Sequence, residues 1–274
     1  MEEKIRKQLE MCKSINDFRN MSYEIIKKIL DNDTSDLLKG DNGFLGQSEK
    51  IRFEVFNLPQ GISCPESTEI CRQGCYQINP EKMHQAPNRD SAVKFYRKKN
   101  LLKSMQKDFV DNMVKNIKGL RPKKGQNIII RIHGSGDFYS QEYMRKWFEI
   151  ALRIRESSKP YVFVAYTKSM NILKCVMEKK TELDDLYMRV CGKTLDQYKI
   201  EDFNINLIGS VMDDTDLKAK NIMDEFKLPK YIVTSKEKKD VYYCGDVACA
   251  DCDGLKCYTF PMHDVYTVLR TKKK

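Results

Sequence analysis

The amino-acid sequence predicts an α/β protein, either a partial (β/α) barrel or an open parallel sheet of about five or six strands. Three observations support this class. From residue 127 to residue 234, short apolar runs alternate with amphipathic helical patterns, which is typical of βαβ units. The 274 residues suffice to bury a large core without disulfide bonds. The strongly apolar runs are strand-sized, and none approaches the roughly 18 residues that span a bilayer.

The predicted elements begin with helix. Apolar side chains recur at three- and four-residue steps over residues 1–38, and the sequence GDNG at residues 40–43 breaks that pattern. Residues 51–56 then alternate between apolar and charged side chains, which predicts the first strand. A long amphipathic helix is expected over residues 91–117, with apolar side chains on one face and lysines on another.

After this helix, strand and helix patterns alternate regularly. Strands are expected at residues 127–133, 161–166, 205–211 and 231–234. Helices are expected at residues 141–155 and 217–226, and helical segments over residues 170–198. This order predicts parallel strands joined by right-handed crossovers. The domains expected from it are an N-terminal helical extension (1–43), an α/β core (44–240) and a C-terminal cysteine-rich metal-binding segment (241–274).

Small, polar or charged residues follow each predicted strand. The second strand runs into His133 and the sequence GSGD at residues 134–137, and the third is followed by Lys168. The carboxyl ends of parallel strands share one edge of the sheet, and ligands bind at that edge. Ordinary βα turns favour the same residue types, so both interpretations stay open for any single turn.

Three side chains at this edge are candidates for chemistry. His133 could position a ligand or move a proton, or it could be a core histidine bonded to a backbone carbonyl. Lys168 could contact a ligand or lie in solvent. Asp137 could accept a hydrogen bond from an ammonium group, or it could cap the next helix near Ser140.

Seven of the ten cysteines fall into two clusters, and the first comprises Cys64, Cys71 and Cys75, directly after the first strand. Thiolates at such short spacings can converge on one ion or cluster. Three thiolates leave one position open. His84 could fill it as a fourth ligand, or a [4Fe–4S] cluster could keep one iron free for a substrate or cofactor.

The second cluster has four cysteines within fourteen positions: Cys244, Cys249, Cys252 and Cys257. The Asp and Gly residues around them predict an exposed loop, which argues against four unrelated buried thiols. Zinc and iron–sulfur both suit four thiolates, and the spacing does not decide between them. Because the sequence starts without an apolar leader, ten thiols indicate metal or redox chemistry rather than a disulfide framework.

The net charge of +10 belongs to one segment. Between Lys82 and Lys124 there are 13 Lys or Arg and 3 Asp or Glu, and the rest of the chain is neutral. Cations interleaved with aromatic side chains suit a nucleic acid or another polyanion. A solvated helix face with its apolar side in the core explains the pattern equally well, and a small anionic substrate or an acidic protein are further alternatives. The cations predicted to contact a polyanion are Lys94, Arg97, Lys98, Lys99, Lys103 and Lys107.

Taken together, these motifs resemble the phage gene product 88 domain family. The resemblance is carried by the three-cysteine loop, by Tyr96 and Asn100, by RIHGSGDF at residues 131–138, by AYTKS at residues 165–169 and by the late cysteines. It runs from about residue 56 to residue 258. It implies a phage or prophage context, and hence a bacterial host, without implying an activity.

More distantly, the chain is similar to radical S-adenosylmethionine enzymes. In those enzymes a three-cysteine loop follows the first strand and holds a [4Fe–4S] cluster, whose open iron binds S-adenosylmethionine. The resemblance implies that Cys64, Cys71 and Cys75 hold such a cluster and that the four later cysteines hold an auxiliary one. The residues that it implies for cofactor binding are Tyr76, Gly134, Ser135, Gly136 and Asp137.

Two functional hypotheses follow. In the first, an iron–sulfur enzyme with one or two [4Fe–4S] clusters cleaves S-adenosylmethionine and modifies a nucleic acid, nucleotide or peptide, with His133, Asp137 and Lys168 as catalytic candidates. In the second, a non-catalytic phage protein uses zinc or iron–sulfur sites to shape a basic nucleic-acid-binding surface. Both are expected in the bacterial cytoplasm, without a membrane partner.

Overall fold

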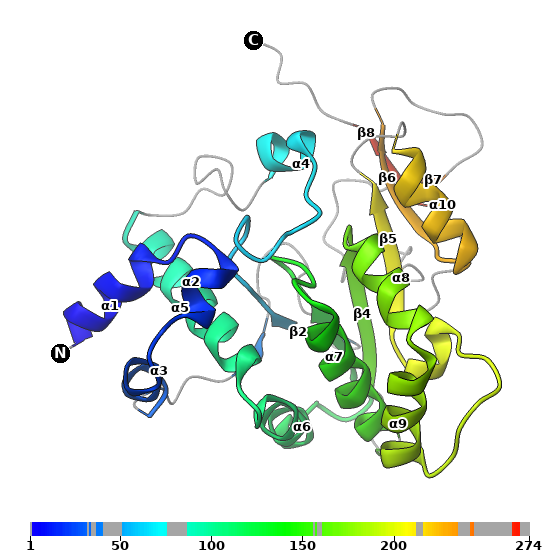
Figure 1. The fold of residues 1–274 in the computed structure, drawn as a ribbon, viewed down its shortest axis with the longest axis horizontal. Helices are drawn as coiled ribbons and strands as arrows, with labels where there is room; N and C mark the ends of the chain where they lie inside the picture. The colour runs from blue at the N-terminus through cyan, green and yellow to red at the C-terminus, as the bar shows by residue number, and fades with distance from the viewer. Residues whose placement is uncertain are drawn as a thin grey trace.

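The computed structural model describes residues 2–31, 33, 37–40, 51–75, 87–155, 157, 161–211, 216–234, 242–243 and 265–268. Over these ranges, three short N-terminal helices precede an alternation of strands and helices (Figure 1). Within the same ranges, no helix combines the length and apolar character that crossing a membrane requires.

The described strands form one open sheet, so the predicted α/β class is confirmed. They are β1 (Lys39–Gly40), β2 (Ile51–Phe56), β3 (Asn127–Ile132), β4 (Tyr161–Thr167), β5 (Asn206–Val211), β6 (Lys230–Thr234), β7 (Tyr242–Tyr243) and β8 (Val265–Val268). Their order across the sheet is β1-β2-β3-β4-β5-β6-β8-β7. Strands β2 to β6 are parallel and follow chain order, β8 and β7 continue in parallel, and β1 pairs antiparallel with β2.

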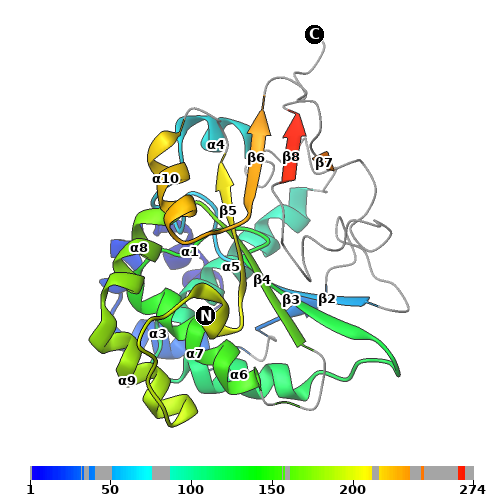
Figure 2. The same ribbon diagram turned by 90° about the vertical axis from the view of Figure 1, so that its right-hand side faces the viewer.

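Helices precede and connect these strands. They are α1 (Glu2–Met11), α2 (Ile15–Arg19), α3 (Tyr23–Leu30), α4 (Glu69–Gly74), α5 (Pro87–Met105), α6 (Phe109–Gly119), α7 (Gln141–Arg155), α8 (Met170–Glu178), α9 (Lys180–Cys191) and α10 (Leu217–Glu225), with a 3-10 turn over Ile200–Phe203. Figure 2 shows α6 to α10 on one face of the sheet. Right-handed crossovers between strands in chain order place successive helices on the same side, which accounts for this arrangement.

Alternation along the strands divides the core between the two faces of the sheet. Phe56 and Ile130 face the helices and belong to the large core cluster. Phe53, Ile129 and Val164 face the other way and form a smaller apolar cluster on the opposite face. The period of two in the strand sequences therefore supplies apolar side chains to both faces, as a sheet covered on both sides requires.

The N-terminal helices are packed onto the α/β core. Leu9, Phe18 and Ile29 are buried in the same large cluster as the sheet residues. On α5, the Lys98 ammonium donates to three carbonyl oxygens at and just beyond the end of α1, at 2.6 to 3.2 Å. A cation at a helix carboxyl end satisfies carbonyls that have no partner within the helix.

Two long predicted helices are each divided in the structure. Residues 1–38 form α1, α2 and α3, and the capping box of Ser14 with Asp17 starts α2 afresh. The predicted helix at 91–117 starts earlier and is broken between α5 and α6, where the Gln106 side chain donates to the Leu102 carbonyl. The helical segments predicted over residues 170–198 form α8 and α9, and α9 ends at Gly192 because that residue takes the left-handed conformation.

Candidate ligand site at the carboxyl end of the sheet

The segment after β2, residues 57–75, carries the first cysteine cluster and is called the cysteine loop below. It is hydrogen-bonded to the turn after β3. The Leu58 amide donates to the Ser135 carbonyl at 2.9 Å, the Ser135 hydroxyl donates back to the Leu58 carbonyl, and the Asp137 amide donates to the Ser63 carbonyl at 3.1 Å. The cysteine loop is therefore fixed against the GSGD turn.

Glycines in the GSGD turn make this close approach feasible. A Cβ atom on Gly134 would lie 2.7 Å from the Asn57 side-chain oxygen. A Cβ atom on Gly136 would lie 2.5 Å from the Ser63 hydroxyl, and Gly136 also has a φ of +81°. Any larger residue would push the turn away from the cysteine loop, so the glycines are required for packing.

Asp137 joins the turn after β3 to the end of β4. Its Oδ1 accepts hydrogen bonds from the Phe138 amide at 2.8 Å and from the Thr167 hydroxyl at 2.6 Å, and its Oδ2 accepts from the Lys168 amide at 2.8 Å. Burial raises the pKa of this carboxyl, while the bonds from Thr167 and Lys168 act in the opposite direction. The helix cap near residue 140 is supplied by Ser140 itself, whose hydroxyl accepts from the Tyr143 amide.

Glu66 joins the cysteine loop to the start of α8. Its carboxylate accepts from the Asn171 amide at 2.9 Å, from the Asn171 side chain at 2.8 Å and from the Ile172 amide at 3.0 Å. Ser169 precedes α8 but makes no side-chain cap of its own. A residue 105 positions earlier therefore caps this helix, with its negative charge at the positive end of the helix dipole.

The three thiols of the cysteine loop are each half-buried. Burial, followed by the Asp137 charge, raises the pKa of Cys64 to about 12. Burial also raises the pKa of Cys71, whereas the charge of Lys168 and a hydrogen bond from it act in the opposite direction. The charge of Cys71 acts on Cys64, and that of Cys75 acts on Cys71, so the thiols share one electrostatic environment.

The side chains of this site can be compared with the ligands that a metal ion or an iron–sulfur cluster requires. Within the ranges that the structure describes, no three His, Cys, Asp or Glu side chains are arranged to hold a metal ion. The residues nevertheless fit in kind, because three thiols on one loop become soft thiolate ligands once a cation stabilises their charge. Desolvation keeps the pKa of Cys64 and of Cys71 high in the isolated chain, and a bound cation would offset that cost.

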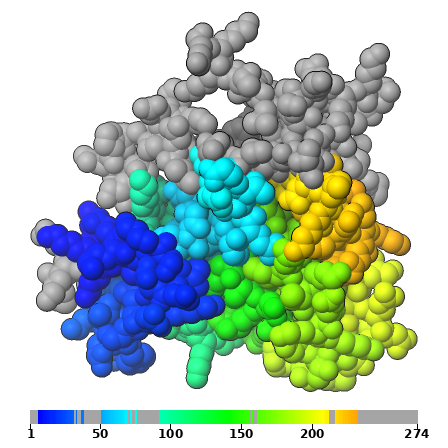
Figure 3. Space-filling model, turned by 45° about the horizontal axis from the view of Figure 1, so that its top comes forward, coloured from blue at the N-terminus to red at the C-terminus, as the bar shows by residue number. Residues whose placement is uncertain are grey.

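A cavity of about 270 Å³ adjoins this site. It is lined by Glu66 and Ser67 of the cysteine loop, by Lys168, Met170 and Asn171 around the start of α8, and by the first turn of α10. In Figure 3 the cysteine loop (cyan) lies at the surface between the N-terminal helices (blue) and α10 (yellow to orange). Lys168 therefore lies both in the wall of a small polar cavity and beside Cys71.

His133 lies in the core and not at the surface of the carboxyl edge. Its side chain is enclosed by Phe138 and Tyr143, and its Nε2 lies 2.8 Å from the Tyr143 hydroxyl. Burial, followed by the charge of Arg131, lowers the pKa of His133 to about 3. Of the two interpretations left open by the sequence, this environment favours the core histidine, although the hydrogen-bond partner is a tyrosine instead of a backbone carbonyl.

Most of the cations predicted to contact a polyanion bind the protein's own chain. Lys98 holds the end of α1, as described above. Lys99 and Lys103 form ion pairs with Asp33 at 2.8 and 2.9 Å. Arg97 is buried and donates to the Gln60 side chain at 3.0 Å. The charge pattern of α5 therefore reflects packing between the N-terminal helices, the cysteine loop and the core.

Several predicted residues lie outside the described ranges: Tyr76, His84, Cys244, Cys249, Cys252 and Cys257. Two residues that organise the site were missed at the sequence level. Glu66 has no local signal beyond its position two residues after Cys64, and its partners lie in another part of the chain. Thr167 belongs to the AYTKS motif, but only the structure pairs it with Asp137.

Comparisons of the sequence with known proteins identify relatives in one phage family. The sequence model described as Gene product 88 matches residues 27–258. The Gene 88 protein of Mycobacterium phage D29 is 32% identical over 143 residues, or 47% of this chain, and the match spans about half, 51%, of that protein. The Gene 88 protein of Mycobacterium phage L5 is 26% identical over 223 residues, or 78% of this chain and 85% of that protein. No solved structure matches.

Proposed function

The chain belongs to the gene product 88 family of phage proteins, and we propose that it is an iron–sulfur protein of the radical S-adenosylmethionine type. In this proposal Cys64, Cys71 and Cys75 hold a [4Fe–4S] cluster, and the four later cysteines hold a second cluster or zinc. The protein would act in the cytoplasm of the bacterial host, where reducing conditions keep thiols available as ligands.

One observation carries the proposal. The cysteine loop is tied to the turn after β3 through Ser63 and Asp137, and to the start of α8 through Glu66. Three neighbouring thiols are thereby held at the carboxyl ends of β2, β3 and β4. Ligand sites of parallel α/β proteins lie at this edge, and metal-binding thiols need such a fixed framework.

The chain's own residues would contribute in separate ways. When bound, a [4Fe–4S] cluster with three cysteine ligands supplies an electron to a ligand at its open iron. Lys168, which bonds to Cys71, would stabilise negative charge on the thiolates. Asp137 would hold the GSGD turn and the end of β4 together, and so orient the cavity that Lys168 lines. His133 would contribute to packing.

The proposed substrate is an anionic group on a nucleic acid, nucleotide or peptide. Support for this part comes from Lys168 in the cavity wall and from Lys107, which is exposed. Lys94 is exposed as well, but it also interacts with other residues of the chain. The other four cations predicted for the same contact give no support, because they bind the protein's own chain.

The test is purification without oxygen, followed by measurement of iron, sulfide, zinc and visible absorption. We expect iron and sulfide with the broad absorption of an iron–sulfur cluster. Cys71→Ala should lower the iron content and abolish reductive cleavage of S-adenosylmethionine to methionine. Cys191→Ala is the matched control, because Cys191 is also half-buried but lies on α9, outside both cysteine clusters.

Two results would reject the proposal. A colourless protein with zinc and no iron would favour the non-catalytic alternative, a metal-stabilised nucleic-acid-binding protein. Cleavage of S-adenosylmethionine that survives Cys71→Ala would show that the three-cysteine loop is not the reactive centre.

A further inference from the structure

The connection between α6 and β3 lies at the opposite end of the sheet from the cysteine loop. The cysteine loop follows β2 and is therefore at the carboxyl edge, whereas this connection precedes β3 and is at the amino edge. Six residues of β3 separate the edges, or about 20 Å. Figure 1 shows α4 of the cysteine loop near the top of the molecule and α6 near the bottom.

The charge of this connection is one-sided. Together with the second half of α6 it forms the stretch of residues 112–126, called the basic connection below, which contains five Lys or Arg and no Asp or Glu. All five cations are exposed: Lys115, Lys118, Arg121, Lys123 and Lys124. Within the described part of the chain, Lys115, Lys123 and Lys124 make no ion pair. Lys115, Lys123 and Lys124 therefore present their charge to solvent. By contrast, Lys98, Lys99 and Lys103 of α5 use theirs within the chain.

Several cations elsewhere on the surface are paired with acids. Lys174 pairs with Glu225 at 2.9 Å, Arg189 with Glu149 at 2.7 Å, and Lys230 with Asp224. A surface of mixed charge is sufficient for solubility. A stretch of one sign instead creates a local field that attracts an oppositely charged partner.

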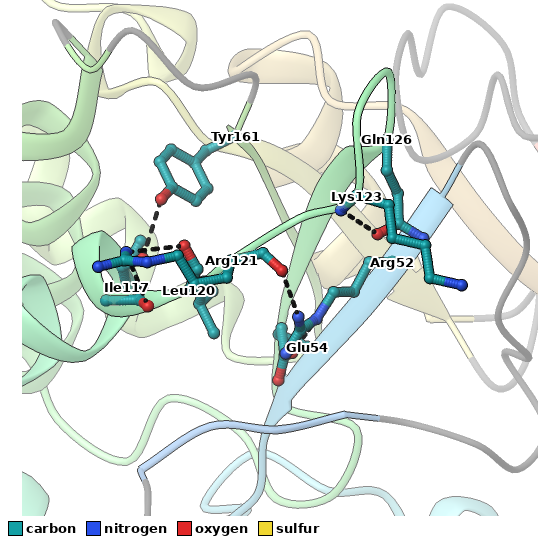
Figure 4. A network of polar contacts seen from close by, with 9 residues as sticks. Arg52, Glu54, Ile117, Leu120, Arg121, Lys123, Gln126 and Tyr161 are labelled. Carbon is teal, nitrogen blue, oxygen red and sulfur yellow. Dashed lines mark hydrogen bonds and ion pairs between the residues drawn. The ribbon is translucent and has the colours of Figure 1, made fainter.

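Polar contacts hold the backbone of this connection in a fixed shape (Figure 4). The Arg121 guanidinium donates to the carbonyls of Lys118, Gly119 and Leu120 at 3.0 to 3.4 Å, and so caps the end of α6. The Arg121 carbonyl in turn accepts from the Arg52 guanidinium at 3.1 Å, and Arg52 is paired with the buried Glu54.

A tight turn then presents the two lysines at the tip. The Lys123 amide donates to the Gln126 side chain at 3.2 Å, and the Gln126 amide donates to the Lys123 carbonyl at 3.0 Å. Gly125 has a φ of +79°, which a larger side chain rarely adopts. The backbone beneath Lys123 and Lys124 is already ordered, so a contact there would not have to order the loop.

We propose that this basic connection, residues 112–126, binds the phosphate backbone of a nucleic acid. Several exposed cations on a stretch held by hydrogen bonds suit an extended partner with evenly spaced negative charges. The contact is independent of the proposed iron–sulfur function, because it uses other residues at the other edge of the sheet. A nucleic acid bound there would dock the protein through this edge and leave the cysteine loop accessible.

The test is fluorescence anisotropy of the full-length protein with a labelled short DNA duplex of mixed sequence, at several salt concentrations. The double variant Lys123→Glu with Lys124→Glu should bind at least about tenfold more weakly at about 0.1 M salt. Its plot of log affinity against log salt should also lose about two units of slope, one for each phosphate contact removed.

The matched control is Lys180→Glu with Lys193→Glu. Both lysines are exposed, lie away from the connection in sequence and change the net charge by the same amount. The control pair should bind DNA within about twofold of the unmodified protein. Equal weakening by both pairs would overturn the proposal, since only total charge would then matter. Absence of DNA binding at low salt would also overturn the proposal. Tighter binding to polyglutamate than to the duplex would overturn it as well, and would favour an acidic protein as the partner.

Discussion

The two edges of the parallel sheet use polar side chains in opposite ways. At the carboxyl edge, Ser63, Ser135, Asp137 and Thr167 are buried and hydrogen-bonded to neighbouring turns. At the amino edge, the cations of residues 112–126 are exposed. The first arrangement fixes the position of a few reactive groups, and the second projects charge into solvent.

This difference predicts different consequences of mutation. A buried polar group that loses its partner costs free energy of unfolding, because the partner is left without a hydrogen bond in a dry environment. An exposed lysine contributes little to stability, but it contributes to attraction over about 10 Å, the screening distance at ordinary salt. Changes at the carboxyl edge should therefore alter stability, and changes at the amino edge should alter salt-dependent binding.

The largest expected effect is the pH dependence caused by His133. Its pKa is about 3 in the folded protein, chiefly because of burial, against an ordinary value of 6.5. Between these values the unfolded chain binds a proton that the folded protein does not bind. Stability should therefore fall as pH falls from 6.5 toward 3, by about 1.4 kcal/mol for each pH unit.

Urea unfolding at a series of pH values measures this effect, with His133→Asn for comparison. Asparagine tolerates the positive φ of +65° at this position but does not titrate. The difference in free energy of unfolding between the unmodified protein and His133→Asn should shrink as pH falls. Parallel pH curves would contradict the assignment of a neutral, buried His133.

The next largest effect is expected at Asp137. Asp137→Ala removes the acceptor for Phe138, Thr167 and Lys168 and should lower the free energy of unfolding by about 3 kcal/mol. Asp137→Asn should lose less, because the amide oxygen still accepts two of these bonds. Urea unfolding measures both variants. If the alanine variant lost less than about 1 kcal/mol of unfolding free energy, the turns after β3 and β4 would hold together without the Asp137 carboxylate.

The smallest effects separate the two edges most directly. Glu66→Ala removes the cap of α8 and should cost about 1 to 2 kcal/mol. Lys123→Met, at the amino edge, should change stability by less than about 0.5 kcal/mol. Thermal unfolding of both variants makes the comparison. Equal losses would contradict the division between a structural carboxyl edge and an exposed amino edge.

Much of the fold could be predicted from the sequence. The five strands from β2 to β6 lie within about one residue of their predicted bounds, since each is a short apolar run between turns. The helix break at Gln106 could not be predicted from the sequence, because apolar side chains recur at helical spacing on both sides of it. A local side-chain bond to the backbone ends the helix there, and the apolar pattern does not report such a bond.

The site could be predicted only in part. Parallel strands bring the cysteine loop and the GSGD turn to one edge, and this follows from strand order alone. The Glu66 contact could not be predicted, because it depends on how α8 sits relative to a loop more than a hundred residues earlier. The role of Lys98 was also hidden, because a lysine on a helix looks the same in sequence whether it faces water or another helix end.

The chain-ordered sheet has a consequence for how the protein is made. As the polypeptide leaves the ribosome, each strand from β3 to β6 emerges after the neighbour with which it pairs, so the sheet can grow from its first strands onward. The cysteine loop emerges early, but Asn171, which binds Glu66, follows 105 residues later. At translation rates of about 5 to 20 residues per second, that interval lasts roughly 5 to 20 s. During synthesis the three thiols are therefore present before the helix that fixes their loop.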